Sequence, residues 1–297
     1  MRYATPAAFR AALEARLNAA ARTEGRPVGR ARKLVAFTRL LARLERTAPD
    51  RWVLKGGFAL ELRLPGQARA TRDVDIDWAA SLDEATNALV EAAALELDDY
   101  FEFDIQRLGD ADIGAAGGVR FHADAYVGGR LFEPLLIDVG VGSESFFAAA
   151  DELMAPDLLD FAEIEPAHIR AIRLEQHIAE KLHAYTRRHA DDQPSSRAKD
   201  LIDIILMSEL APFDFDSLRE AVVRVFAAWA THELPASLPA PPREWARPYR
   251  ALAGEVGLDP DLSAGHRLAA AFLNPIVADT PDLARWDAQA IQWQRRG

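Results

Sequence analysis

The sequence contains no cysteine, and this absence excludes several kinds of chemistry. Without thiols the chain can form neither disulfides nor thiolate metal sites, and it has no cysteine nucleophile. Its seven histidines are dispersed and lack the close spacing of a zinc site. These absences direct attention to the carboxylates as candidates for catalysis and metal binding.

Long hydrophobic runs are also missing. No stretch reaches the roughly eighteen apolar residues that a membrane-spanning helix needs, and the basic amino terminus lacks the apolar centre of a signal peptide. A hydrophobic content of 49% with 27% charged residues is ordinary for a soluble globular protein. We therefore expect a cytoplasmic protein without membrane contact, and a chain of 297 residues is long enough for two domains.

The charge is unevenly distributed along the chain. The net charge is −11, but residues 1–51 carry 12 Lys and Arg against 4 Asp and Glu, whereas residues 52–297 carry 23 against 42. The amino-terminal segment (+8) is thus a basic layer on an acidic body (−19). It is either a solvated helical face or a local docking surface for a phosphate backbone.

The first half of the chain mixes helical and strand patterns. Apolar residues at three-to-four spacing indicate helices, β-formers between turn signals indicate strands, and Gly128-Gly129 is a hairpin signal. A mixed α/β sheet is the natural assignment. We expect helices over residues 6–22, 30–47, 58–64 and 82–97, and strands over 52–55, 73–78, 101–108, 119–127 and 131–139.

From residue 174 onward the periodicity is helical. Four prolines over residues 234–242 indicate a linker. The expected domains are a basic helical segment over residues 1–50 that packs on the core, a core over 51–165, and a helical domain over 166–297. Expected helices cover 174–188, 197–210 with Ser195 or Ser196 as cap, 215–231, and two or three more that include Leu283 to Arg295.

The most informative stretch runs from Leu54 to Asp77. In an extended strand alternate side chains share a face, so Asp73, Asp75 and Asp77 should project together. Carboxylates this close repel each other, and a divalent cation relieves the repulsion. The alternative is an exposed strand edge decorated with charge, although aspartate is a poor strand former. Upstream, a glycine pair allows the backbone to approach a phosphate, so the stretch predicts a Mg²⁺–nucleotide site.

A third metal ligand could come from Asp138, which lies in the apolar run Leu-Leu-Ile-Asp-Val. A buried charge without a partner is costly, so a metal, another cation or the protein surface must accompany it. Asp104 is a weaker candidate for the same role.

The helical half contains a second charged group. Lys181 lies mid-helix and is either a surface lysine or a functional one; no acidic residue lies three or four positions away, which weakens the first alternative. Asp200 and Asp203 lie three apart on one face of the following helix, and Asp200 is also placed to complement the helix dipole. A lysine over a triphosphate would neutralise charge on departing pyrophosphate, and a buried aspartate could hold that lysine or the substrate hydroxyl.

Four ordered motifs together resemble the AbiEii/AbiGii nucleotidyltransferase toxins. These are DNA polymerase β-like enzymes of type IV toxin–antitoxin systems and include the MenT-type toxins. The resemblance spans about residues 30–210. The motifs are Lys55-Gly-Gly-Phe-Ala-Leu, Arg69-x-Thr-x-Asp-Val-Asp75, Ala179-Glu-Lys-Leu-His-Ala184 and Arg197-x-Lys-Asp-Leu-x-Asp203.

The resemblance implies a polymerase β-like mixed sheet followed by a helical domain, with the active site in the cleft between them. It implies Mg²⁺-dependent transfer of a nucleotide from an NTP, to the tRNA 3′ end in MenT-type members, and a cognate antitoxin partner. Two metal ions would activate the attacking hydroxyl and stabilise the leaving oxygen. Carried over by position, the catalytic residues are Asp73, Asp75, Lys181 and Asp203, the nucleotide-binding residues are Lys55, Gly56, Gly57, Arg69, Thr71, Arg197 and Asp200, and the metal ligands are Asp73, Asp75 and Asp138.

One position departs from the family pattern. Members commonly carry Thr or Ser after the glycines, whereas this chain has Phe58. Backbone N–H groups or Thr71 would then have to contact the triphosphate. Two alternatives stay open: a nucleotidyltransferase that acts on a small molecule or a protein hydroxyl, and a nucleotide-binding regulatory protein that has lost catalysis.

Overall fold

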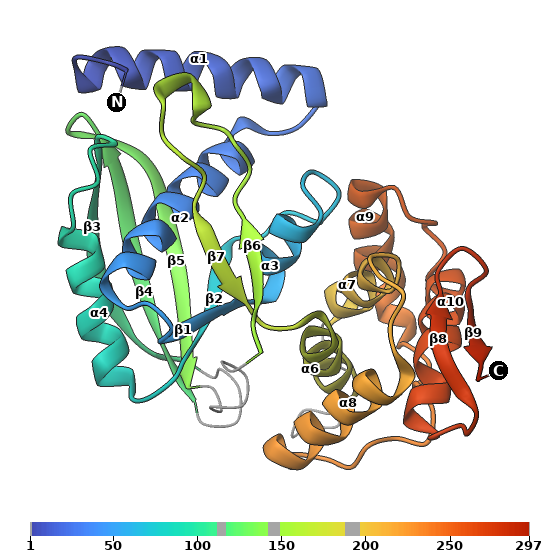
Figure 1. The fold of residues 1–297 in the computed structure, drawn as a ribbon. Helices are drawn as coiled ribbons and strands as arrows, with labels where there is room; N and C mark the ends of the chain where they lie inside the picture. Colours follow the sequence, from blue (N-terminus) through green and yellow to red (C-terminus); the bar gives the residue numbers. More distant parts are fainter. Residues whose placement is uncertain (1, 112–116, 142–148, 188–196, 297) are drawn as a thin grey trace. The chain divides into compact units, whose positions relative to one another are not determined.

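A computed structural model describes residues 2–111, 117–141, 149–187 and 197–296. The chain divides into two compact units (Figure 1). The first comprises residues 1–65 and 70–172, and the second comprises the short segment 66–69 together with residues 173–297. No helix in the described ranges is long and apolar enough to cross a membrane.

The first unit is built on a seven-stranded mixed sheet, which confirms the predicted α/β class. The strand order is β3-β4-β5-β2-β1-β7-β6. β2 pairs parallel with β5, and β1 pairs parallel with β7, while the other neighbours are antiparallel. The elements are α1 (Pro6–Glu24), α2 (Val28–Thr47), β1 (Trp52–Lys55), α3 (Gly56–Arg63), β2 (Asp73–Trp78), α4 (Leu82–Ala94), β3 (Phe101–Ala111), β4 (Gly118–Val127), β5 (Arg130–Val141), β6 (Asp151–Met154), a 3-10 turn (Asp160–Ala162) and β7 (His168–Ala171).

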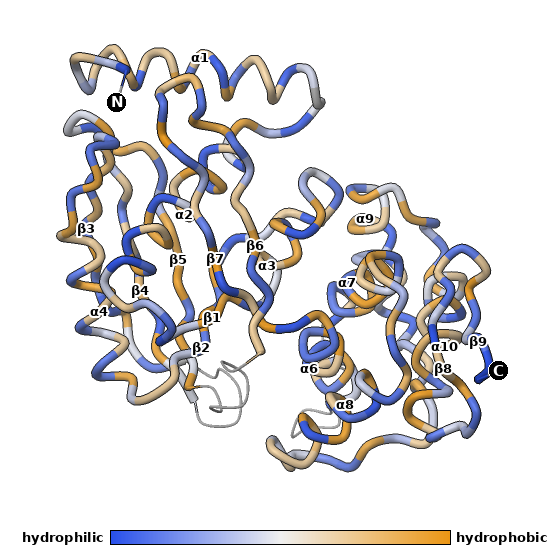
Figure 2. The backbone as a smooth tube through the Cα atoms, in the orientation of Figure 1, coloured by the Kyte–Doolittle hydropathy of each residue, from blue (hydrophilic) through white to orange (hydrophobic). Residues whose placement is uncertain are grey.

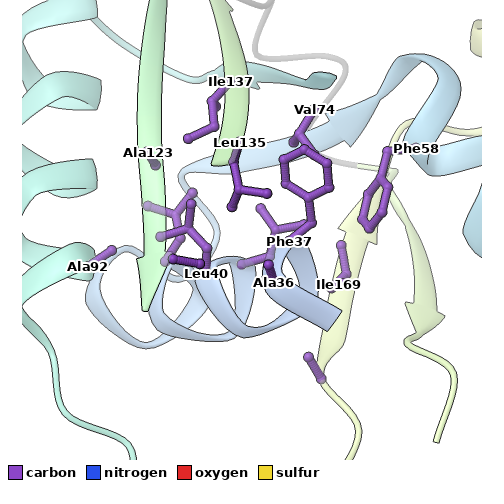
Figure 3. Packing of buried hydrophobic residues seen from close by; sticks show 14 of the residues in the cluster. Ala36, Phe37, Leu40, Phe58, Val74, Ala92, Ala123, Leu135, Ile137 and Ile169 are labelled. Carbon is purple, nitrogen blue, oxygen red and sulfur yellow. The ribbon is translucent and has the colours of Figure 1, made fainter. Parts of the chain in front are cut away.

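Helix α2 supplies one wall of the core of this unit. Its apolar face, including Phe37 and Leu40, packs against sheet residues such as Leu135 and Ile137 (Figure 3). Figure 2 shows hydrophobic residues concentrated along β5, which lies inside the sheet between β4 and β2. Burial of this face accounts for most of the stability of α2, because helical propensity alone contributes little.

The arginines of the amino-terminal segment are largely used inside the unit. The guanidinium of Arg10 donates to backbone carbonyls at the β4–β5 turn, including that of Arg130 at 2.6 Å. Arg32 pairs with Glu14 at 2.6 Å and so links α2 to α1. Other arginines of α2 are buried against Asp99. These contacts favour a structural role for much of this charge over the docking of a phosphate backbone.

The second unit is mainly helical. Helices α7 (Ala198–Ser208), α8 (Phe215–Trp229) and α10 (Leu262–Val277) each bury an apolar face. The patterns predicted over residues 174–188, 197–210 and 215–231 correspond to observed helices. Arg188 and the two predicted caps, Ser195 and Ser196, lie outside the described residues. The elements are α6 (Leu174–Thr186), α7 (Ala198–Ser208), α8 (Phe215–Trp229), a 3-10 turn η2 (Arg243–Trp245), α9 (Ala246–Val256), α10 (Leu262–Val277), β8 (Leu283–Asp287) and β9 (Gln292–Arg295).

The predicted helix from Leu283 to Arg295 is wrong. This stretch forms an antiparallel hairpin in which Trp286 lies opposite Trp293. Both indoles are buried, and each donates its N–H to a helix carbonyl, at 2.9 Å for Trp286 and 2.8 Å for Trp293. Burial of two large aromatic rings outweighs the helical propensity of the alanines between them.

Candidate active site

The carboxylates of β2 share one face, as the alternation of the strand predicts. Val74 and Ile76 are each 1% exposed and lie in the core. Asp73 and Asp75 are partly exposed on the opposite face, while Asp77 is buried. Two carboxylates are therefore accessible at one end of the strand, and the third is enclosed.

A row of charged residues crosses four neighbouring strands at this point. Asp75 lies opposite Asp138 of β5 and also opposite Lys55 of β1. Asp138 in turn lies opposite Arg120 of β4. Because residues in register share a face of the sheet, a cation stands at each end of the row and the two carboxylates stand between them.

The backbone of Gly56 lies directly against the carboxylate of Asp75. Its φ is +66°, in the left-handed region that glycine tolerates best, and a Cβ there would lie 1.8 Å from Asp75 Oδ2. Only a residue without a side chain allows this carboxylate to lie against the amino-terminal end of α3. The dipole of the helix favours negative charge at that position.

Lys55 and Asp77 form an ion pair within the site. The Lys55 ammonium lies 2.5 Å from Asp77 Oδ1, and both residues are buried. Lys55, which is predicted to bind nucleotide, is thus held by the one carboxylate of β2 to which the sequence analysis assigned no role. Thr71, the predicted small hydroxyl, donates to the carbonyl and carboxylate of Asp73, at 3.1 and 3.3 Å, and so orients that carboxylate.

Asp138 has a protein cation as its partner. Both of its oxygens accept hydrogen bonds from Arg120 at 2.6 Å. The hydrogen bonds and charge of Asp138, with Asp73 and Asp75 further away, raise the pKa of Arg120. Sequence analysis allowed a metal, another cation or the protein surface as the partner of Asp138, and in the structure the partner is a cation, Arg120.

Whether the site could bind a magnesium ion depends on which oxygen ligands its side chains offer. The described residues contain no group of three or more His, Cys, Asp or Glu poised to hold a metal. Mg²⁺ commonly takes one or two carboxylates and completes its shell with water and substrate phosphates. Asp73 and Asp75, accessible on one face beside the bare backbone of Gly56, fit an ion of this kind.

The second unit contains a closed network around Lys181. Its ammonium lies 3.1 Å from Asp200 Oδ1 and 2.8 Å from Asp203 Oδ2. Arg69 donates to both oxygens of Asp203 at 2.8 Å, and Arg197 approaches Asp200 at 3.6 Å. Asp200 and Asp203 are both fully buried. The network brings together every predicted site residue of the two helical motifs, and it also contains Arg69.

The electrostatics of this network hold Lys181 and Asp203 in their charged forms. Burial alone would lower the pKa of Lys181, but the charges of Asp203 and Asp200 outweigh it and raise that pKa. Burial alone would raise the pKa of Asp203, but Lys181 and Arg69 lower it well below its usual range. At neutral pH the lysine is an ammonium and the aspartate a carboxylate.

Phe58 is a core residue. Its side chain is 1% exposed and meets Phe37 edge-on, with ring centroids 5.1 Å apart (Figure 3). The side chain at this position, where the resemblance leads to the expectation of Thr or Ser, therefore points into the core of this unit. A nucleotide at the Gly56-Gly57 turn would be met by backbone N–H groups rather than by this side chain.

Sequence reasoning missed two contributors to the site. Arg120 had no motif around it, and only the requirement of Asp138 for a cation could have pointed to it. Asp77 was identified as a carboxylate, but its role in holding Lys55 depends on the pairing of β1 with β2.

Comparisons with known proteins agree on one group. The family model described as the nucleotidyl transferase AbiEii toxin, type IV toxin–antitoxin system, matches residues 39–292. Among solved structures, MenT4, a nucleotidyltransferase toxin from Mycobacterium tuberculosis H37Rv, aligns with a TM-score of 0.54 over 93% of this chain and 99% of its own, at 17% identity. This likeness establishes the fold alone. No curated protein matches the chain.

Proposed function

The chain belongs to the AbiEii family of nucleotidyltransferase toxins of type IV toxin–antitoxin systems, and on this premise we propose that it transfers a nucleoside monophosphate from an NTP to an RNA hydroxyl. The resemblance inferred from the four sequence motifs is confirmed by the family match. The acceptor oxygen would bond to the α-phosphorus, the bond from that phosphorus to the β-phosphate oxygen would break, and pyrophosphate would leave. The hydroxyl proton would pass to solvent.

The observation that carries the proposal is the accessible pair Asp73 and Asp75 beside the bare backbone of Gly56. We assign these two carboxylates to Mg²⁺. When bound, magnesium ions supply charge neutralisation on the triphosphate and lower the pKa of the attacking hydroxyl. Thr71 orients Asp73, and Asp77 positions Lys55 near the triphosphate. Asp138 remains a proposed ligand, although its carboxylate would first exchange Arg120 for the metal.

Lys181 is the proposed phosphate-contacting cation. An ammonium has three N–H donors, and two of them are directed at Asp200 and Asp203. The third is left for a phosphate oxygen, where the charge of the departing pyrophosphate develops. We assign Asp203 to positioning this lysine and Arg69 to supporting Asp203, rather than to direct contact with the nucleotide. Arg197 is partly exposed and stays a candidate for direct contact.

We propose the 3′ end of tRNA as the acceptor, which would block aminoacylation and arrest growth. Membership of a toxin–antitoxin family implies an antitoxin partner and an NTP substrate. Both proposed substrates occur in the cytoplasm, which is therefore the proposed place of action. A small-molecule or protein acceptor would use the same carboxylates and is distinguished by where a label appears.

The test is incubation of the full chain with each of the four α-labelled NTPs, Mg²⁺ and total tRNA. We expect label on tRNA with one or more NTPs, and none with the Asp73→Ala variant, which should remain folded. Removing Mg²⁺ with a chelator should also abolish labelling. No label on RNA with any NTP, while expression still arrests growth, would refute the RNA acceptor. Label on protein or on a small molecule would support the other acceptor classes.

A further inference from the structure

The second unit contains a cavity outside the candidate active site. It has a volume of about 560 Å³ and is lined by residues of η2, α9 and α10 and of the turns before them. Its walls are apolar in part, with Pro241, Ala246 and Leu262 among the lining residues. This size falls within the range of about 300–1,000 Å³ that is typical of ligand pockets.

Three arginines from three elements line this cavity. Arg243 belongs to η2, Arg250 to α9 and Arg267 to α10, and all three are exposed. Within the described part of the chain, none of them makes an ion pair or a side-chain hydrogen bond. Other arginines described above, such as Arg10, Arg32 and Arg120, are paired with carboxylates or carbonyls, whereas these three line one cavity together.

Asp261 provides the only carboxylate among the residues that line the cavity. It is the N-cap of α10, and its Oδ1 accepts the backbone N–H of Ser263 at 3.0 Å. One carboxylate offsets at most one of the three arginine charges. The cavity therefore has an excess of positive charge in a chain whose net charge is −11.

The spacing of the arginines is set by a close helix contact. A Cβ on Gly265 would lie 1.9 Å from the hydroxyl of Tyr249, so α10 approaches α9 where glycine leaves room for the tyrosine ring. Arg250 follows Tyr249 directly, and Arg267 lies two residues beyond Gly265. The backbones that carry these arginines are thus fixed by packing, which lowers the entropic cost of binding a ligand between them.

We propose that this cavity binds a nucleotide unit of the RNA acceptor, with the arginines on its backbone phosphates. The inference rests on the proposed RNA acceptor. A guanidinium matches the geometry of a phosphate in a two-point contact and also stacks on bases, and the apolar wall suits a base or ribose. Three arginines without partners fit the closely spaced charges of a phosphodiester chain, and an acidic protein needs such a local site to hold RNA.

The test compares two variants with the same charge change. In the first, Arg250→Glu and Arg267→Glu are combined. In the control, Arg247→Glu and Arg295→Glu are combined; both arginines are exposed, neither lines the cavity, and neither has an ion pair among the described residues. Fluorescence anisotropy with labelled total tRNA, without NTP, measures affinity over a range of salt concentrations. An Arg250→Gln, Arg267→Gln pair provides a milder variant if the charge reversal impairs folding.

We expect the dissociation constant of the cavity variant to rise at least 10-fold relative to the control near 0.1 M salt. The slope of log affinity against log salt should become less steep by about 1.4 to 1.8, because each of the two lost phosphate contacts removes about 0.7–0.9. Equal affinities and slopes in cavity variant and control would overturn the inference, as would a wild-type chain that binds no RNA. Loss of a protein partner with RNA binding retained would instead assign the cavity to protein docking.

These results separate the inference from the proposed function. If the wild type labels tRNA while the cavity variant binds it as the control does, the inference fails and the proposed function stands. If the cavity variant loses RNA affinity but the wild type never labels RNA, the inference stands and the proposed transfer fails.

Discussion

The two charged clusters differ in where their compensating charge comes from. In the first unit, Asp73 and Asp75 are partly exposed, and Asp73 has only the hydroxyl of Thr71 as a side-chain partner within the described residues. In the second unit, Asp200 and Asp203 are fully buried and bound to cations of the same unit. The carboxylates of the second unit are neutralised by cations of the protein itself. The partly exposed carboxylates of the first unit are suited to binding the cation of a ligand.

This difference indicates a division of tasks. A buried ion-pair network is rigid, because loss of one partner leaves the other charge buried and unpaired. An accessible carboxylate pair carries repulsion that a bound cation relieves. We therefore expect substitutions in the first cluster to change activity with little effect on stability, and substitutions in the second to change stability first.

The largest expected effect is the loss of transfer when Asp73 is replaced. Asp73→Asn should lower the rate of nucleotide transfer by about 1,000-fold, because it removes charge where the proposed metal binds. The midpoint of thermal unfolding should stay the same or rise, since repulsion with Asp75 is removed. Single-turnover kinetics and differential scanning calorimetry measure the two quantities. A fully active or a markedly destabilised variant would contradict the division of tasks.

Asp203→Asn should show the opposite behaviour. It leaves Lys181 and Arg69 buried with one anion fewer, and removal of one partner from a buried pair costs about 3–5 kcal/mol. Urea denaturation should show this loss in the free energy of unfolding. Asp216→Asn, which alters an exposed carboxylate of the same unit, is the control and should change stability by less than about 1 kcal/mol. If Asp203→Asn unfolded with the same free energy as wild type, the ion pairs of Asp203 with Lys181 and Arg69 would not contribute to stability.

A third comparison uses pH. Burial, with a smaller effect from the neighbouring His232, lowers the pKa of His183 to about 4. Its Nε2 lies 3.0 Å from the Thr231 hydroxyl, and its Nδ1 is buried without a partner among the described residues. Since the unfolded pKa is about 6.5, the stability that this group contributes is present above pH 6.5 and is lost as pH falls toward 4.

The expected size of this loss is about 2–3 kcal/mol, because lowering a pKa by one corresponds to about 1.4 kcal/mol. Urea titrations of wild type and His183→Asn between pH 7 and pH 4 would measure it, and the variant should show a smaller dependence. His168→Asn, at an exposed histidine of the first unit, should keep the wild-type profile. Parallel profiles for all three proteins would show that His183 does not titrate in this range.

The smallest effect sharpens the description of the first cluster. Gly56→Ala would place a Cβ against the carboxylate of Asp75 at a positive φ, and we expect a loss of about 1–3 kcal/mol together with reduced transfer activity. Gly29→Ala is the matched control, because that glycine lies in α2 with nothing within 4 Å of the added carbon. It should be neutral or stabilising by up to about 1 kcal/mol. Equal stabilities would mean that the backbone at Gly56 relaxes.

Much of the fold was predictable because local pattern and tertiary structure agree. The strands β1 and β2 were predicted to the residue, and Gly128-Gly129 does form the hairpin turn, with φ of +60° and +70°. The short strands β6 and β7 were missed, since four residues carry too little alternation to identify a strand. The hairpin at Trp286 and Trp293 was missed because its alanines favour a helix, while its stability depends on distant helix carbonyls.

Most residues of the candidate site were predictable from the sequence, but their arrangement in space was not. The motifs identified Asp73, Asp75 and Lys181, whereas Arg120 depended on strand register. Counting back from the hairpin turn places Arg120 opposite Ile137, but an extra residue in β5 near Phe132 shifts the register by one and brings it opposite Asp138. A bulge of this kind leaves no clear signal in a single sequence.

The alternation along β2 has a consequence for how the chain reaches its fold. The strand must pair with β5 in one direction and with β1 in the other, and both registers must be correct together. A slip by one residue would bury Asp73 and Asp75 among hydrocarbon and expose Val74 and Ile76. The charges of the candidate active site would then oppose any slip by an odd number of residues, so these carboxylates also help to specify the register of β2 while the sheet assembles.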